Sequence, residues 1–304
     1  MRKAKGMISE EEMLEIFPHP SVREVAFELR FAPRLRIASE VWRIQDSLAE
    51  SYPAVSQETQ PQDAGGLIPT YVFANSQAGR SIKVSQESFA VVFREYGSFE
   101  EFKDEALRRT DAFSDKFGIQ TFHRAGLRYV NHIELAPGQG IEDLKRYVNL
   151  PIDFDRFNPA SIEELSTELR LAVEEHKMTI RDALLRVPGK DGSRFVLDLD
   201  CHTFEHVEVE DLPLLMDQFH RKIQIQFLEH IREEYKQKAR RLQPISPSLR
   251  MLRLARAHQS NQIRSAGKLP TASPAATCCP ASTIAWLPIC APSPIIVGVT
   301  RTFS

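Results

Sequence analysis

The sequence predicts an α+β protein built on a long antiparallel sheet. Runs of alternating apolar and polar residues indicate strands with one buried face, and apolar residues at helical spacing indicate helices that pack on that face. The order strand–helix–strand–strand–strand–helix occurs twice, in residues 21–120 and again in residues 121–240. A unit of this order can lay both helices on one face of an antiparallel sheet. Two units joined edge to edge would form one long curved sheet with all helices on one side.

The first unit begins with a strand in which Val25, Phe27, Leu29 and Phe31 alternate with polar or small residues. Apolar residues at helical spacing follow and stop at a Tyr-Pro pair, which ends a helix. We expect a loop rich in Gln, Pro and Gly next, and then a Ser-x-x-Glu capping box that opens a second helix. The predicted elements are the helix over 37–52, the loop over 54–66, strands near 68–74, 80–86 and 88–95, and the capping box Ser98–Glu101.

The second unit repeats this order. Its long first strand places Leu127, Tyr129, Asn131 and Ile133 on one face. The closing helix has an N-cap aspartate with a proline just inside and an apolar stripe at i, i+4 spacing. The predicted elements are strands near 122–135, 166–176, 178–188 and 193–202, a turn at 188–192, a helix near 140–149, and the closing helix from Asp211 with Leu215, Phe219, Ile223, Phe227 and Ile231 as its stripe.

The doubled organisation resembles the tandem arrangement of TATA-binding-protein-like folds. This is a resemblance of architecture, from which function does not follow. Residues 1–20 are expected to form a lead-in, with a capping box at Ser9–Glu12 and a short helix that stops at Pro18. No apolar segment follows the basic start, so we expect no signal peptide and a cytoplasmic protein.

The net charge of −2 hides a strong asymmetry. The last acidic residue is Glu234, so residues 1–234 carry 29 basic and 41 acidic residues, a net charge of −12. Residues 241–304 are acid-free and rich in Pro, Ala and Ser, which predicts disorder. Their apolar stretch near the end is interrupted by prolines, which excludes a membrane span. The segment is either a basic interaction arm or the product of a shifted reading frame, and we favour the shifted frame because its basic residues are sparse.

The strand over 195–202 carries the pattern most suggestive of chemistry. Asp198, Asp200 and His202 point to one face of the sheet, and Cys201 lies among the buried apolar residues of the other. Two carboxylates and an imidazole in line could bind a divalent metal in a hydrolase or nuclease. The plainer interpretation, which we favour, is the solvated face of a half-buried antiparallel sheet.

Other polar residues on the same predicted face are candidates for binding a partner. Arg128 beside Tyr129 could hold a phosphate or a carboxylate, but a cross-strand ion pair with Glu28, Glu134 or Asp198 is the favoured interpretation. Gly126 marks a bulge or a close approach. The candidate binding residues are Glu28, Arg30, Arg128, His132 and Glu134.

Familiar catalytic signatures are absent from the sequence. It has no Gly-rich phosphate loop, no nucleophile elbow, no His-Glu-x-x-His and no zinc spacing among its four cysteines. The composition is that of a globular protein, which excludes a collagen or a disulfide-dense miniprotein. We therefore expect a non-enzymatic binding or assembly module without a cofactor. Its open sheet face would meet a protein partner or a second copy. The acidic body makes nucleic acid an improbable partner.

Three segments together resemble an uncharacterised, sporadically distributed bacterial family. They are His19–Phe31, the motif Arg-x-Gly-Leu-Arg-Tyr-Val-Asn at Arg124–Asn131, and Phe195–Asp200 followed by the long closing helix. The resemblance covers roughly residues 15–240, and the family has no established activity to carry over to this chain. Its sporadic distribution suggests an accessory or defence-associated role. The segment after residue 240 lies beyond the usual end of the family, which agrees with a shifted reading frame.

Overall fold

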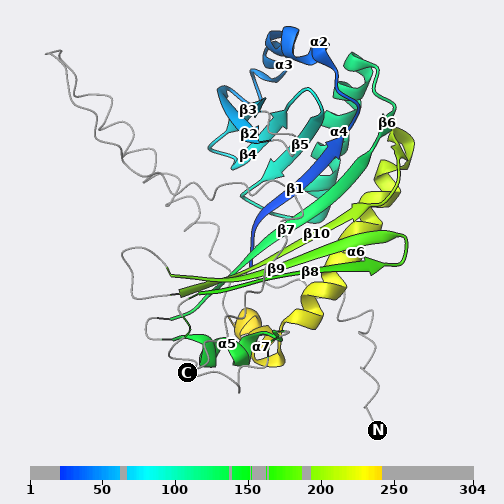
Figure 1. The fold of residues 1–304 in the computed structure, drawn as a ribbon. Coiled ribbons are helices and arrows are strands. Elements are labelled where there is room, and N and C mark those ends of the chain that lie inside the picture. The colour runs from blue at the N-terminus through cyan, green and yellow to red at the C-terminus, as the bar shows by residue number, and fades with distance from the viewer. Residues whose placement is uncertain are drawn as a thin grey trace, which may run out of the picture. The chain divides into compact units, whose positions relative to one another are not determined.

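The computed structural model describes residues 21–61, 67–136, 139–150, 152, 162, 164–186 and 193–241 (Figure 1). Most of these residues belong to one compact unit, which runs to Glu58 and resumes at Pro69, and the account below concerns that unit. The expected N-terminal helix, the turn over 188–192 and the expected tail from residue 242 onward lie outside the described residues.

A nine-stranded sheet forms the centre of the fold. The strand order is β2-β3-β4-β5-β1-β7-β10-β9-β8, and the pairs from β3 to β8 are antiparallel. The predicted large antiparallel sheet with helices is therefore confirmed. The strands are β1 (Val22–Arg30), β2 (Ala54–Pro61), β3 (Leu67–Asn75), β4 (Arg80–Val84), β5 (Ser88–Phe93), β7 (Arg124–Glu134), β8 (Leu165–Val173), β9 (His176–Arg186) and β10 (Ser193–Thr203), with β6 (Thr121–Phe122) and β11 (Val207–Glu208) in a small second sheet.

Two long helices pack on one face of this sheet. α4 (Phe99–Phe117) starts at Ser98, whose hydroxyl accepts a hydrogen bond from the Glu101 amide, as the capping box predicts. It ends at Gly118, whose φ of 63° is the left-handed conformation that glycine adopts readily. α6 (Leu212–His230) lies beside α4 behind the sheet (Figure 1). The shorter helices are α2 (Leu35–Ser39), α3 (Val41–Leu48), α5 (Ile141–Tyr147), η3 (Val209–Asp211) and α7 (Glu233–Arg241).

The core lies between the sheet and these helices. The strand residues that face the helices are fully buried, among them Phe27, Leu127 and Leu199. Phe102 of α4 and Phe219 of α6 are also fully buried, so the helical stripes predicted from spacing do face the core. Burying each such side chain contributes roughly 1.5–3 kcal/mol to stability, which makes this face the main source of stability in the fold.

The expected loop over 54–66 is partly wrong, because residues 54–61 form the edge strand β2. The side chains from Ala54 to Thr59 are all exposed, so neither face of this strand is apolar and no period of two appears in the sequence. Glu58 accepts a hydrogen bond from the buried ammonium group of Lys83 at 2.9 Å, which connects this strand to β4.

The expected helix over 37–52 is divided into two helices, α2 and α3, at Glu40. Among the described residues, no helix is both long enough and apolar enough to cross a membrane.

Candidate functional site

The face of the sheet opposite α4 and α6 carries an array of charged side chains, which we call the charged face. Alternation along the strands places these side chains there, as the sequence predicts. The register of the central strands then sets them in rows: Glu28 lies opposite Gly126, and Asp200 lies opposite Arg128. The charged face comprises Glu24, Glu28 and Arg30 of β1, Arg94 after β5, Arg124, Arg128, His132 and Glu134 of β7, Arg194, Asp198, Asp200 and His202 of β10, Arg181 of β9, and Glu168 and Arg170 of β8.

Arg128 and Asp198 form the ion pair that the sequence favours. Both contacts of the guanidinium with the carboxylate, Nε to Oδ1 and Nη2 to Oδ2, are 2.7 Å long. Arg181 approaches the same carboxylate from the next strand, at 3.3 Å. Burial opposes the charged form of Arg128, but its hydrogen bonds to Asp198 outweigh burial and raise the pKa of the guanidinium. Arg128 is therefore engaged in a two-contact ion pair with Asp198.

Arg124 forms a second bridge, which sequence reasoning missed. Its guanidinium lies over Gly126 and joins Glu28 on one neighbouring strand, at 3.1 Å, to Asp200 on the other, at 3.0 Å. A Cβ atom on Gly126 would lie 2.8 Å from Nη1 of Arg124, which is closer than side-chain contacts allow. The glycine thus makes room for the arginine, and the close approach expected at Gly126 is that of a side chain. The available signal was the Arg-x-Gly spacing, which puts both residues on the same face.

The remaining charges of the array are paired toward its rim. Arg194 contacts Glu134 at 2.8 Å, Arg30 contacts Glu28 at 3.3 Å and Arg94 contacts Glu24 at 3.0 Å. Each of the four carboxylates Glu28, Glu134, Asp198 and Asp200 contacts an arginine. A partner would therefore meet a face whose charges are balanced.

Two imidazoles on the charged face are held neutral. Burial is the main cause in both and neighbouring cations act in the same direction; together they lower the pKa of His202 to about 3 and that of His132 to about 4. Nδ1 of His202 and Nε2 of His132 are buried without a hydrogen-bond partner, and so is Nε of Arg124. Buried polar atoms normally find partners, so these three atoms call for an explanation.

The metal alternative for Asp198, Asp200 and His202 does not fit this geometry. Arginines occupy both carboxylates, and Nδ1 of His202 lies 3.8 Å from Asp200 without a hydrogen bond. In the described part of the chain, no three His, Cys, Asp or Glu side chains gather in a way that could hold a metal ion. The alternation placed the three residues on one face correctly, but it did not reveal that cations already surround the carboxylates.

Tyr129 and Asn131 face the helices, whereas Arg128 faces the other side, so the alternative in which Arg128 and Tyr129 together hold a phosphate or a carboxylate is not formed. The Tyr129 hydroxyl lies 3.1 Å from Nδ1 of His220 on α6 and 3.2 Å from the Tyr96 hydroxyl. Phe99 stacks on the His220 ring with 3.8 Å between ring centroids. Burial raises the pKa of Tyr129 well above its usual value and lowers that of His220 to about 4. Asn131 is buried and accepts a hydrogen bond from Ser21. These contacts join β7 to α6 and serve the packing of the core. Cys201 is a buried free thiol, as predicted.

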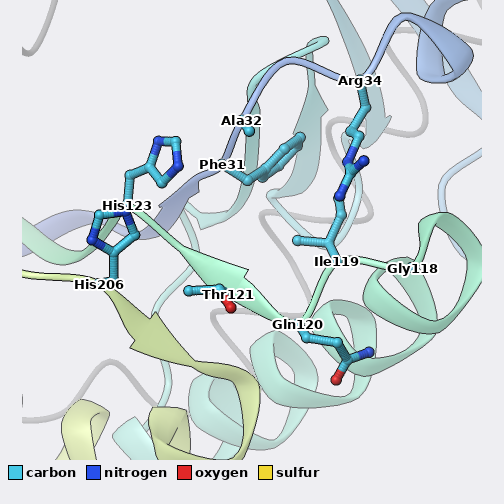
Figure 2. Close-up of a pocket in the computed structure, with 9 residues that line it drawn as sticks. All are labelled: Phe31, Ala32, Arg34, Gly118, Ile119, Gln120, Thr121, His123 and His206. Atoms are coloured by element: carbon cyan, nitrogen blue, oxygen red, sulfur yellow. The ribbon is translucent and has the colours of Figure 1, made fainter.

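A pocket of about 270 Å³ lies apart from the charged face, beyond the end of β1 (Figure 2). His123 and His206 meet edge to face at one end, and Arg34 reaches toward Ile119 at the other. The lining residues include no carboxylate, and the Thr121 hydroxyl is engaged with Glu208 at 3.1 Å. The lining therefore offers two imidazoles and a guanidinium, but no carboxylate that could orient them.

No known family profile matches this chain, and no curated protein matches it. A search of solved structures returned the di-domain ARO/CYC StfQ from the steffimycin biosynthetic pathway, with 13% sequence identity and a TM-score of 0.14. The match covers 79% of this chain and 99% of that chain. A TM-score this low carries no argument about fold or function.

Proposed function

We propose that this chain is a non-enzymatic binding or assembly module that presents the charged face of its sheet to a protein partner. The observation that carries the proposal is the set of buried polar atoms without partners on that face: Nε of Arg124, Nε2 of His132 and Nδ1 of His202. Such atoms cost free energy unless a partner or water satisfies them. All three lie on the central strands β7 and β10, and because each is buried within the unbound chain, a partner's polar groups reach them only when neighbouring side chains of the charged face move.

The chemistry of the face defines the kind of partner. Its formal charges are matched within the sheet, so a strongly charged partner would have to break existing pairs, such as Arg128 with Asp198. A partner that offers uncharged backbone and side-chain hydrogen-bonding groups can bind without breaking these ion pairs. An Nε–H donor and neutral imidazole nitrogens suit backbone carbonyls, hydroxyls and amides. A protein surface rich in such groups fits better than a polyanion.

The arrangement of the two halves suits such a role. We propose that residues 21–120 and 121–240 are tandem units in a TATA-binding-protein-like organisation, with the order β-α-β-β-β-α in the second unit and the additional edge strand β2 in the first. Their first strands, β1 and β7, pair at the centre, and in each half the last strand, β5 or β10, lies beside the first. A long sheet with its two long helices on one side leaves the other side for recognition.

Site-specific photocrosslinking tests this proposal. A photoreactive phenylalanine analogue replaces Val130, a half-buried residue that shares the charged face with Arg128, in the full chain expressed in the source organism. The matched control carries the same analogue at Leu214, an exposed residue of α6. We expect one discrete crosslinked protein from Val130 and none from Leu214.

The captured protein must then bind the purified chain directly. V130R places a large cation on the charged face and should weaken that binding at least tenfold, whereas L214R should leave it unchanged. Equal crosslinking from both positions, or a captured protein that binds V130R as tightly as the unaltered chain, would overturn the proposal. Circular dichroism of both variants checks that each remains folded.

A further inference from the structure

A second recognition surface lies at the edge of the sheet, on β8. This strand is the last in the sheet order, and the described residues place no strand against its outer side. β8 is nine residues long and most of its side chains are exposed or half-buried. An edge of this length exposes backbone N–H and C=O groups that can pair with another strand. Its side chains show which strand would fit.

The sequence of β8 is self-complementary about its centre. Leu169 is the middle residue, and its side chain is 42% exposed although the neighbouring Ile180 of β9 is buried. Glu168 and Arg170 flank it and carry opposite charges on the charged face. Two pairs at equal distances from Leu169 are matched: acid with base next to the centre, and Leu165 with Val173 at the ends.

We propose that two copies of this chain pair antiparallel along β8, with a two-fold axis at Leu169. In this register, Glu168 of each copy lies opposite Arg170 of the second copy, and the two Leu169 side chains cover each other. Arg170 contacts Glu168 of its own chain at 2.5 Å, and because its side chain is 58% exposed it can also reach Glu168 of the second copy. The two sheets then continue into one another across the two-fold axis.

The charges and the helices select this register over its neighbours. A shift of the axis to Glu168 would set the two Glu168 carboxylates opposite each other, and a shift to Arg170 would do the same with two arginines. A register whose axis falls between two residues would put the helices of the two copies on opposite sides of the joint sheet. Of the registers with an axis between Glu168 and Arg170, only the one centred on Leu169 avoids both conflicts.

Disulfide trapping gives a direct test of the register. The full chain is prepared with Cys278, Cys279 and Cys290 replaced by serine, so that the buried Cys201 is the remaining natural thiol. L169C should then form a covalent dimer under mild oxidation. The control is L185C, because Leu185 has the same 42% exposure but belongs to β9, the strand inside β8 in the sheet order. Equal dimer formation by both variants would overturn the proposed contact.

Charge exchange gives a second test that needs no crosslink. The mass of the full chain in solution is measured by light scattering over a concentration series. E168R and R170E each create two like-charge contacts across the axis, so each should weaken the dimer about tenfold, while the double variant E168R/R170E restores it. A chain that is monomeric at all concentrations, or a double variant no better than the single ones, would overturn the proposal. The edge is distinct from the position probed by V130R, so failure here leaves the proposed function intact.

Discussion

The two faces of the sheet are built from the same strands but are held together in different ways. Toward the helices, β7 presents Leu127 and Tyr129 to a close-packed core; toward the other side it presents Arg124 and Arg128 to carboxylates on both neighbouring strands. Burial of apolar area has no direction and depends mainly on volume. The charged face depends on partners at fixed positions. Replacing one member of a charge pair at a time is therefore expected to lower stability, whereas the core should accept substitutions that preserve volume.

The largest loss is expected in the core. Phe195 of β10 is fully buried and lies opposite Ile133 and Leu184 on the two adjacent strands. Phe195→Ala removes apolar contacts and leaves a cavity, which should lower the free energy of unfolding by about 4 kcal/mol. Urea denaturation followed by circular dichroism measures it. Phe195→Met preserves most of the volume and should cost less than about 1.5 kcal/mol, so equal losses would contradict the volume argument.

A somewhat smaller loss is expected when a buried bridge is broken from one side. Asp200→Met leaves Arg124 without one of its two carboxylate partners, and the side chains of this pair are only 10% and 2% exposed. We expect a loss of about 3 kcal/mol because the buried charge of Arg124 is then compensated only by Glu28. The double variant R124M/D200M removes both charges and should recover most of that loss. A double variant that is much less stable than D200M would mean that the charged face is itself a source of stability.

Acid should destabilise the fold through imidazoles on both faces of the sheet. His220 lies at the helix junction with its pKa lowered to about 4, against an unfolded value near 6.5. The unfolded chain therefore takes up this proton at higher pH than the folded chain does. Stability is fully present above pH 6.5 and declines as the pH falls toward 4, by on the order of 2 kcal/mol between pH 7 and pH 5. His132 and His202 add to the loss in the same direction.

The control for this pH dependence is His220→Gln, which cannot titrate and still offers an acceptor to the Tyr129 hydroxyl. Its free energy of unfolding should fall less steeply between pH 7 and pH 5 than that of the unaltered chain. Identical slopes for the two proteins would show that His220 is not buried as a neutral imidazole. Thermal unfolding at several pH values provides the comparison.

The alternation along each strand was enough to assign residues to faces. Asp198, Asp200 and His202 could be placed together because a period of two leaves no other arrangement in an extended strand. The partners could not be predicted, because Arg124 and Glu28 are 96 positions apart and meet only through the register of β1 on β7. The strand β2 was predicted as a loop because it has no apolar face, so its sequence shows no alternation of apolar and polar residues. Local periodicity predicts orientation, whereas pairing depends on contacts between distant strands.

The smallest effect should come from the glycine that makes room for the bridge. Gly126→Ala places a Cβ atom 2.8 Å from a guanidinium nitrogen of Arg124, so the arginine must shift and weaken its contacts with Glu28 and Asp200. The arginine is flexible, and we expect a loss of only about 1 kcal/mol in the free energy of unfolding. In the R124M/D200M background no guanidinium remains to be displaced, so the same substitution should be close to neutral. A double-mutant cycle over these four proteins measures the coupling. An equal loss in both backgrounds would show that Gly126 serves the backbone of β7 and not the side chain that crosses it.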